Sequence, residues 1–236
     1  MYNSIASENK IKPTLSLFCV AEKANVAAIS VGGQQHGMVA LDESGEVIRP
    51  ALLWNDTRSA AQAESLNSEM GGNQAIADAV GSVLVASFTA SKVRWMAENE
   101  KKNADRVHSI ALPHDWLSWQ LQGGKDFSKL FTDRSDASGT GYFDPKSSTY
   151  RRDILAKALL SDREVYLPTI IAPSTFGGAT SAGIPIAPGA GDNAGAALGV
   201  QAEPAAEGRP VRVAAGDEHE VAARVVGGHQ VAHEAF

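Results

Sequence analysis

The chain has 236 residues, a formal net charge of −6 at pH 7 and 44% hydrophobic residues. This fits a soluble globular protein of one or two domains, and an acidic balance without a basic cluster argues against nucleic acid or a membrane as partner. We therefore expect a small-molecule ligand. The single cysteine, Cys19, excludes an intrachain disulfide and a paired-cysteine metal motif. Because no signal-peptide or membrane-spanning pattern is seen, we expect a cytoplasmic protein.

The predicted elements alternate between strands and helices. Residues 1–25 are polar and weakly patterned. The apolar run Val26–Val31 predicts a buried strand ending at glycine, and the runs Met38–Leu41 and Val47–Leu53 predict a hairpin. Further along the chain we expect helices at Thr57–Met70, Thr89–Asn99, Asp115–Leu121 and Arg151–Leu160, and a strand at Val107–Leu112. This alternation indicates an α/β architecture.

The segment 201–236 differs from the rest of the chain. It has no clean strand or helix period and carries half of the chain's six histidines. We expect it to be a disordered tail. His229 and His233 in HQVAH have the spacing of a zinc hydrolase helix, but Gln230 stands where the catalytic Glu is needed. We therefore predict no metal ligand.

One carboxylate stands out in the stretch Ile184–Gly199. Asp192 follows two glycines and directly precedes a small-residue run that reads as a helix. A carboxylate at this position is either an ordinary N-cap or a general base. As a general base, it would be kept ionised by the helix dipole, and the nearby glycines would let a substrate approach it.

Three polar clusters, GGQQHG, LLWNDTRS and GAGDNAG, each end an apolar run. In an open α/β sheet such loop ends converge on one cleft. A kinase acting on a sugar needs a carboxylate to accept the hydroxyl proton, groups that fix the polyol, and a phosphate cradle. The first two parts are present in these clusters.

Five strings in this order resemble the FGGY carbohydrate kinases, and within them the xylulokinases, over about Val26 to Val200: ISVGGQQHGMVALDESGEVIRPALLWNDTRS, SFTASKVRWMAEN, LPHDWLSWQL, TDRSDASGTGYFD and PGAGDNAGAALG. The resemblance implies an actin-like, ribonuclease-H-like α/β domain, the N-terminal domain of a sugar kinase. It also implies that the complete enzyme phosphorylates D-xylulose to D-xylulose 5-phosphate with ATP and Mg²⁺.

The resemblance assigns roles to individual residues. Asp192 would be the general base, and Gln35 and His36 would bind the sugar, with Gln35 in place of the family's usual Met. Asn193 would also touch the polyol. Residues expected to stand behind these are Trp54, Asn55, Asp56, Arg58 and Asp136. We expect two further residues of the matched segment to be structural, Trp95 in the core and Lys92 on a solvated helix face.

The chain also departs from the family. No Asp-x-Gly-Thr loop precedes Val26, and no Gly-Thr-Ser-Gly loop follows Val200. We therefore expect a 26–200 domain that lacks the first strands of its sheet, a fragment inactive alone. Two alternatives stay open: a non-catalytic sugar-binding remnant, and a dinucleotide-binding domain suggested by Gly189, Gly191 and Gly195. The oligomeric state is open too, a homodimer being one option.

Overall fold

The computed structural model describes residues 26–193, residue 195 and the backbone of 222–227. Within these ranges the chain has the α/β architecture that the sequence predicts. Its helices are α2 (Ala60–Glu69), α3 (Asn73–Val80), α4 (Thr89–Asn99), α5 (Lys101–Ala104), α6 (Pro113–Leu121), the 3-10 turn η2 (Phe127–Lys129), α7 (Arg134–Ser138) and α8 (Arg152–Leu159).

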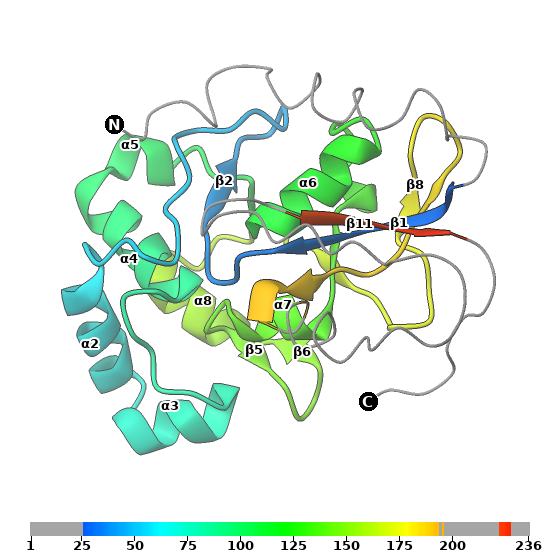
Figure 1. Cartoon of the computed structure of the whole chain (residues 1–236). Helices are drawn as coiled ribbons and strands as arrows, with labels where there is room; N and C mark the ends of the chain where they lie inside the picture. The colour runs from blue at the N-terminus through cyan, green and yellow to red at the C-terminus, as the bar shows by residue number, and fades with distance from the viewer. Residues whose placement is uncertain (1–25, 194, 196–221, 228–236) are drawn as a thin grey trace.

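The main sheet is built around β1 (Val26–Gly33). Its five strands include β9 (Pro185–Ile186) and β10 (Ala190–Gly191), both parallel to β1, and β8 (Gly178–Ala179), antiparallel to β9. The fifth, β11 (Ala222–Gly227), is antiparallel to β1. Segments far apart in the sequence therefore lie side by side in this sheet (Figure 1).

Three short strand pairs complete the fold: β2 (Val39–Leu41) with β3 (Ser109–Ala111), β4 (Phe131–Thr132) with β7 (Thr169–Ile170), and β5 (Phe143–Asp144) with β6 (Thr149–Tyr150). In Figure 1 the helices α2 to α5 gather on the left, and β1, β8 and β11 lie to the right. Helix α6 packs against β1. No helix in the described ranges is long and apolar enough to cross a membrane.

Local capping sets where two helices near the predicted site begin. Helix α6 starts at Pro113, which needs no hydrogen-bond acceptor for its nitrogen, and Asp115 Oδ2 accepts the Leu112 amide at 2.9 Å. Helix α7 is capped by Asp133, whose Oδ1 accepts the amides of Ser135 and Asp136 at 2.7 and 3.1 Å. Both cap carboxylates also reach His114, described below.

The core has two parts. The larger is formed by α2, α3, α4 and α8 with β3 and includes Leu66, Ile76, Val93, Met96, Ile110 and Ile154. The smaller lies between β2, β3 and α6 and contains Val39, Leu41, Ala111, Trp119 and Leu130. Trp95 packs against the larger cluster while partly exposed, which agrees with its prediction as a core residue.

Three expectations differ from the structure. The predicted hairpin of Met38–Leu41 with Val47–Leu53 forms only as isolated antiparallel bridges, Met38 with Leu52 and Leu41 with Val47, and the continuous ladder of β2 is made with β3. Lys92 is 0% exposed, so its prediction as a solvated residue is wrong. Within the segment expected to be a disordered tail, β11 pairs with β1; the HQVAH histidines lie outside the described residues.

Candidate functional site

The predicted base lies at the carboxyl end of the main sheet. In the parallel pair of β1 and β10, Gly33 is opposite Gly191, so the residues that follow both strands emerge together. Asp192 directly follows β10 and begins the helical segment that includes Asn193; both side chains are exposed. Asp192 Oδ1 accepts the amide of Asn193 at 2.8 Å. The carboxylate therefore faces solvent beside the loop after β1.

Gln35, in that loop, is held on both sides. Its Nε2 donates to the carbonyl oxygen of Ser135 at 2.8 Å. A Cβ on Gly191 would lie 2.6 Å from the Gln35 side chain, so glycine is what lets Gln35 cross over the end of β10. The predicted sugar-binding residue thus packs on the residue before Asp192.

His36 has a fixed backbone and ring. Its φ is 67°, a left-handed conformation that non-glycine residues seldom adopt. Its Nδ1 donates to the Gly139 carbonyl oxygen at 2.8 Å, and its ring lies 4.8 Å from the ring of Phe88, centroid to centroid. Its carbonyl accepts from Thr89 Oγ1 at 3.2 Å.

The ring of His36 is poised to be neutral. Burial lowers its pKa below the usual 6.5, and the charge of Lys92 acts in the same direction. The hydrogen bond to Gly139 and the charge of Asp192 oppose this shift without cancelling it. A neutral ring with a proton on Nδ1 presents Nε2 as an acceptor.

The segment Trp54–Arg58 lies on the surface beside α4. Asp56 Oδ1 accepts from Arg58 Nε at 2.9 Å, and the Arg58 guanidinium lies 4.8 Å from the Trp95 ring centroid. Trp54 is 46% exposed and Asn55 is exposed. Asp56 is linked to the predicted site through Lys92, whose charge acts on both Asp56 and His36.

Lys92 was missed as a residue of this region. Its Nζ donates to the Ala86 carbonyl at 3.0 Å and also contacts the Ser87 carbonyl. Burial lowers its pKa from 10.5 to about 7, against the attraction of Asp56. Lys92 therefore anchors the loop that presents Phe88 to His36.

Asp136 is fully buried and pairs with His114 rather than facing Asp192 or Gln35. The backbone of the same helix, however, reaches both sugar-site side chains through Ser135 and, just past its end, Gly139. Asp136 therefore lies in the buried layer next to His114, and its role behind the sugar site stays a prediction.

Comparison with known proteins identifies the family. The model of the FGGY family of carbohydrate kinases, N-terminal domain, matches residues 11–199. The chain belongs to this family. The FGGY match begins at residue 11, within the segment 1–25 that looked weakly patterned. It favours a kinase domain over the dinucleotide-binding alternative.

The relatives of this FGGY domain include several xylulose kinases. The chain is 44% identical over 194 residues to the xylulose kinase of Streptomyces coelicolor and 42% identical over 201 residues to that of Streptomyces rubiginosus. These matches cover 79% and 82% of this chain but 39% and 40% of the relatives. The crystal structure of xylulose kinase from Bifidobacterium adolescentis matches with a TM-score of 0.71 at 41% identity, covering 80% of this chain and 47% of that one.

The predicted site residues of this FGGY domain stand out in the sequence, whereas the residues that contact them do not. Asp192, Gln35 and His36 stand in short motifs, and the structure gathers the ends of their strands. Lys92, His114 and Gly139 were not predicted as site residues, although the sequence offered two signals: the Pro-His-Asp start of α6 and the glycine of SGTG.

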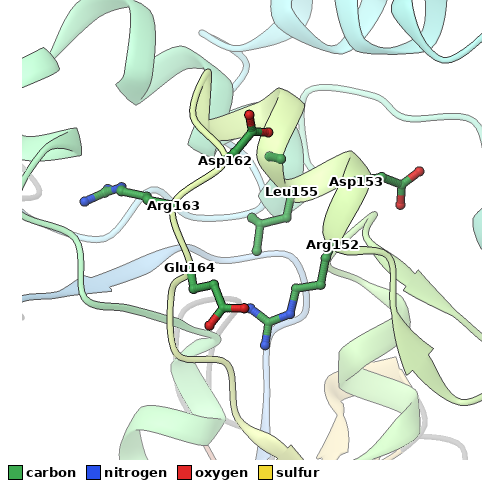
Figure 2. Close-up of a pocket in the computed structure, with 7 residues that line it drawn as sticks. Arg152, Asp153, Leu155, Asp162, Arg163 and Glu164 are labelled. Atoms are coloured by element: carbon green, nitrogen blue, oxygen red, sulfur yellow. The ribbon is translucent and has the colours of Figure 1, made fainter.

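A cavity of about 280 Å³ lies elsewhere, beside α8 (Figure 2). Arg152 and Glu164 point toward one another in Figure 2, and Arg152 Nη1 donates a hydrogen bond to the Val165 carbonyl oxygen at 2.7 Å. It is lined by Arg152, Asp153, Leu155, Ala156, Asp162, Arg163 and Glu164. None of the predicted site residues lines it, so it is not the candidate site.

Proposed function

We propose that this chain supplies the sugar-binding half of an ATP-dependent kinase that converts D-xylulose to D-xylulose 5-phosphate in the cytoplasm. The observation that carries the proposal is the pairing of β1 with β10, which brings the residues after Gly33 and Gly191 to one end of the sheet. The xylulose kinase relatives at 42 to 44% identity support D-xylulose as the sugar. Both strands come from the segment that the FGGY model matches.

In this proposal Asp192 takes the proton of the attacking sugar hydroxyl. Asp192 Oδ1 already accepts the Asn193 amide, and the remaining carboxylate lone pairs are open to the substrate. As the proton moves to Asp192, the sugar oxygen bonds to the γ-phosphorus, and the bond from that phosphorus to the oxygen of ADP breaks. The side chains of Gln35, His36 and Asn193 hold the polyol in place for this step.

ATP with Mg²⁺ supplies the phosphoryl group and neutralises its charge. The described residues do not form a cradle for the triphosphate. The two glycines that precede Asp192 are packed against protein, Gly189 against His114 and Gly191 against Gln35. We therefore assign only the sugar side of the reaction, and the proton transfer, to the described residues.

The test combines sugar binding with phosphate transfer. Isothermal titration should show that the chain binds D-xylulose more tightly than its aldose isomer D-xylose. ADP release by the chain alone should be slow or absent in the presence of ATP and Mg²⁺. In a fusion of this chain to the remaining part of the Streptomyces coelicolor relative, Asp192→Asn should lower ADP release by about 10² or more, because an amide cannot accept the proton. The same variant should change sugar affinity by less than about threefold, since its hydrogen-bonding shape is kept.

Asn193→Ala is the matched control. It should weaken sugar affinity more than it slows transfer, since it removes an amide and leaves the base. Absence of D-xylulose binding would overturn the proposed function. Sugar binding with no ADP release by the fusion would favour the non-catalytic sugar-binding remnant, and unchanged turnover of the fusion with Asp192→Asn would reduce that residue to a helix cap.

A further inference from the structure

A buried charge cluster centred on His114 lies beneath the candidate site. His114, on α6, is 1% exposed. Its Nε2 lies 3.0 Å from Asp133 Oδ2, and its Nδ1 lies 3.0 Å from Asp115 Oδ1 and also contacts Asp136 Oδ2. The three carboxylates are 0 to 7% exposed. One imidazole thus faces three buried acids from two helices.

The charges of the cluster favour an imidazolium. Burial opposes protonation, but the charges of Asp136 and Asp115 outweigh it and raise the pKa of His114 well above 6.5. Among the described residues, no lysine or arginine forms an ion pair with these carboxylates. Within that part of the chain, His114 is therefore the one cation paired with the three carboxylates, and burial raises the pKa of Asp136 to about 6.

The cluster reaches the sugar-binding residues through α7. Asp133, which contacts His114 Nε2, also caps α7 by accepting the Ser135 and Asp136 amides. The carbonyl of Ser135 accepts from Gln35. The carbonyl of Gly139, just past the end of α7, accepts from His36. A shift of His114 would move α7 and with it both acceptors.

The cluster also touches the strand ends that lead to the predicted base. A Cβ on Gly33 would lie 2.9 Å from the His114 Cβ. A Cβ on Gly189 would overlap the His114 ring. Gly189 stands three residues before Asp192, and Gly33 is the register partner of Gly191. His114 is thus packed against both chain segments that meet at the site.

We propose that His114 is a positioning residue that fixes the sugar-binding pair, Gln35 and His36, relative to Asp192. It acts as a buried cation: ion pairs hold α7 on one side, while on the other its Cβ packs against Gly33 at the end of β1 and its ring packs against Gly189 before β10. This role rests on the proposed sugar-kinase function, while the coupling of the two segments is a property of the fold alone.

A metal ion is the rival occupant, because ligand atoms of His114, Asp115 and Asp136 lie within 4.8 Å of one another. Both nitrogens of the ring already lie 3.0 Å from carboxylate oxygens, so a protonated ring pairs with them without an ion. Asp115 Oδ1 and both side-chain oxygens of Asp136 make no well-directed hydrogen bond, and these are the atoms that an ion would bind. Zn²⁺ or Mn²⁺ retained at one equivalent after dialysis, and lost in Asp136→Asn, would overturn the imidazolium role.

The test compares His114→Gln, which removes the cation, with His114→Lys, which keeps one. Hydrogen exchange of the peptides 32–37 and 187–193 should be about tenfold faster or more in the Gln variant, while α2 serves as an internal reference. D-xylulose affinity should fall by about tenfold, the scale of a lost charge-assisted hydrogen bond. His114→Lys should recover most of both losses.

The outcomes separate the two claims. Faster exchange in both peptides without D-xylulose binding by the unmodified chain would leave the coupling standing and overturn the proposed function. Exchange in the Gln variant that is unchanged in either peptide, or Lys and Gln variants that behave alike, would overturn the positioning role. If His114→Gln does not fold, Asp133→Asn replaces it in the test, because it keeps an oxygen acceptor for the α7 amides. Hydrogen exchange in this variant should be faster in both peptides, 32–37 and 187–193. Faster exchange in only one of them would overturn the positioning role of His114.

Discussion

The imidazole of His36 donates from Nδ1 to the carbonyl oxygen of Gly139, 2.8 Å away across 103 residues of chain. Because a carbonyl only accepts, this bond fixes the tautomer of the neutral ring and makes Nε2 the acceptor. A sugar hydroxyl is the kind of donor such a nitrogen binds.

Sugar affinity is expected to depend on the protonation of His36. Burial lowers the pKa of His36 below 6.5 in the folded chain. Above pH 6.5 the ring is therefore mostly neutral, which is the form that binds sugar. Affinity for D-xylulose, measured by titration calorimetry from pH 5 to 8, should be constant at the upper end and fall once pH drops below the lowered pKa. His36→Gln should remove this pH dependence. Affinity that rises on acidification would contradict the neutral-ring assignment.

Gly191→Ala should weaken sugar binding without unfolding the domain. The added methyl would lie 2.6 Å from the Gln35 side chain and displace it from the Ser135 carbonyl. Loss of one such hydrogen bond, with a shifted ligand, predicts about a tenfold loss of D-xylulose affinity. Gly195→Ala is the control, because nothing lies within 4 Å of its Cβ position, and it should leave affinity unchanged. Equal effects of the two variants would show that Gln35 does not bind the sugar.

The buried Lys92 predicts a pH-dependent stability. Its pKa is about 7 in the fold and 10.5 as a free side chain, so the cost of burying its charge is full below pH 7 and relieved as pH rises toward 10.5. The melting temperature of the unmodified chain should therefore rise relative to Lys92→Met between pH 7 and 9. The exposed Lys125→Met should give a difference that does not vary with pH. A constant difference for Lys92→Met would show that its ammonium stays charged in the fold.

Arg94 joins three helices and should matter more than a surface ion pair. It makes two hydrogen bonds to Glu69 of α2, at 2.7 and 3.0 Å, one to Glu98 at 2.6 Å and one to the Lys157 carbonyl of α8 at 3.1 Å. Arg94→Lys loses the forked geometry and should lower the free energy of unfolding by about 1 to 3 kcal/mol in urea titrations.

The exposed pair Lys101 and Asp105 provides the comparison for Arg94. Its side chains are 80% and 62% exposed, so Lys101→Met should cost less than about 0.5 kcal/mol. Similar losses in Arg94→Lys and Lys101→Met would mean that the α2, α4 and α8 junction is held by apolar packing alone.

Local signals were enough to predict several elements. Helix α4 runs from Thr89 to Asn99 as expected, because its apolar spacing is contained in the helix itself. The second partner of β2 could not be read in the same way. Val47–Leu53 makes the predicted antiparallel bridges to Met38 and Leu41, but Ser109–Ala111, brought from much further along the chain, forms the continuous ladder with Val39–Leu41. The apolar pattern of a segment does not show which distant segment it pairs with.

The same limit applies to the site. Asp192 could be named from its place between two glycines and a helix, and Gln35 and His36 from the resemblance to the FGGY motifs. The burial of Lys92 depends on carbonyls of the loop that precedes α4, and the ion pairs of His114 join α6 to α7. Neither arrangement follows from residue type or spacing, since a lysine on an amphipathic helix and a histidine at a helix start are more often exposed or singly bonded.

The pairing of β11 with β1 has a consequence for solubility. β11 hydrogen-bonds to β1 from Val26 to Gly32, whereas β9 and β10 meet it only at Ile29, Gly32 and Gly33. An apolar strand with open backbone donors and acceptors is a template for edge-to-edge association of copies. The family model ends at residue 199, so a strand beyond the matched segment covers β1. Cutting the chain before Ala222 would expose the backbone of VAAISV to pairing with other copies.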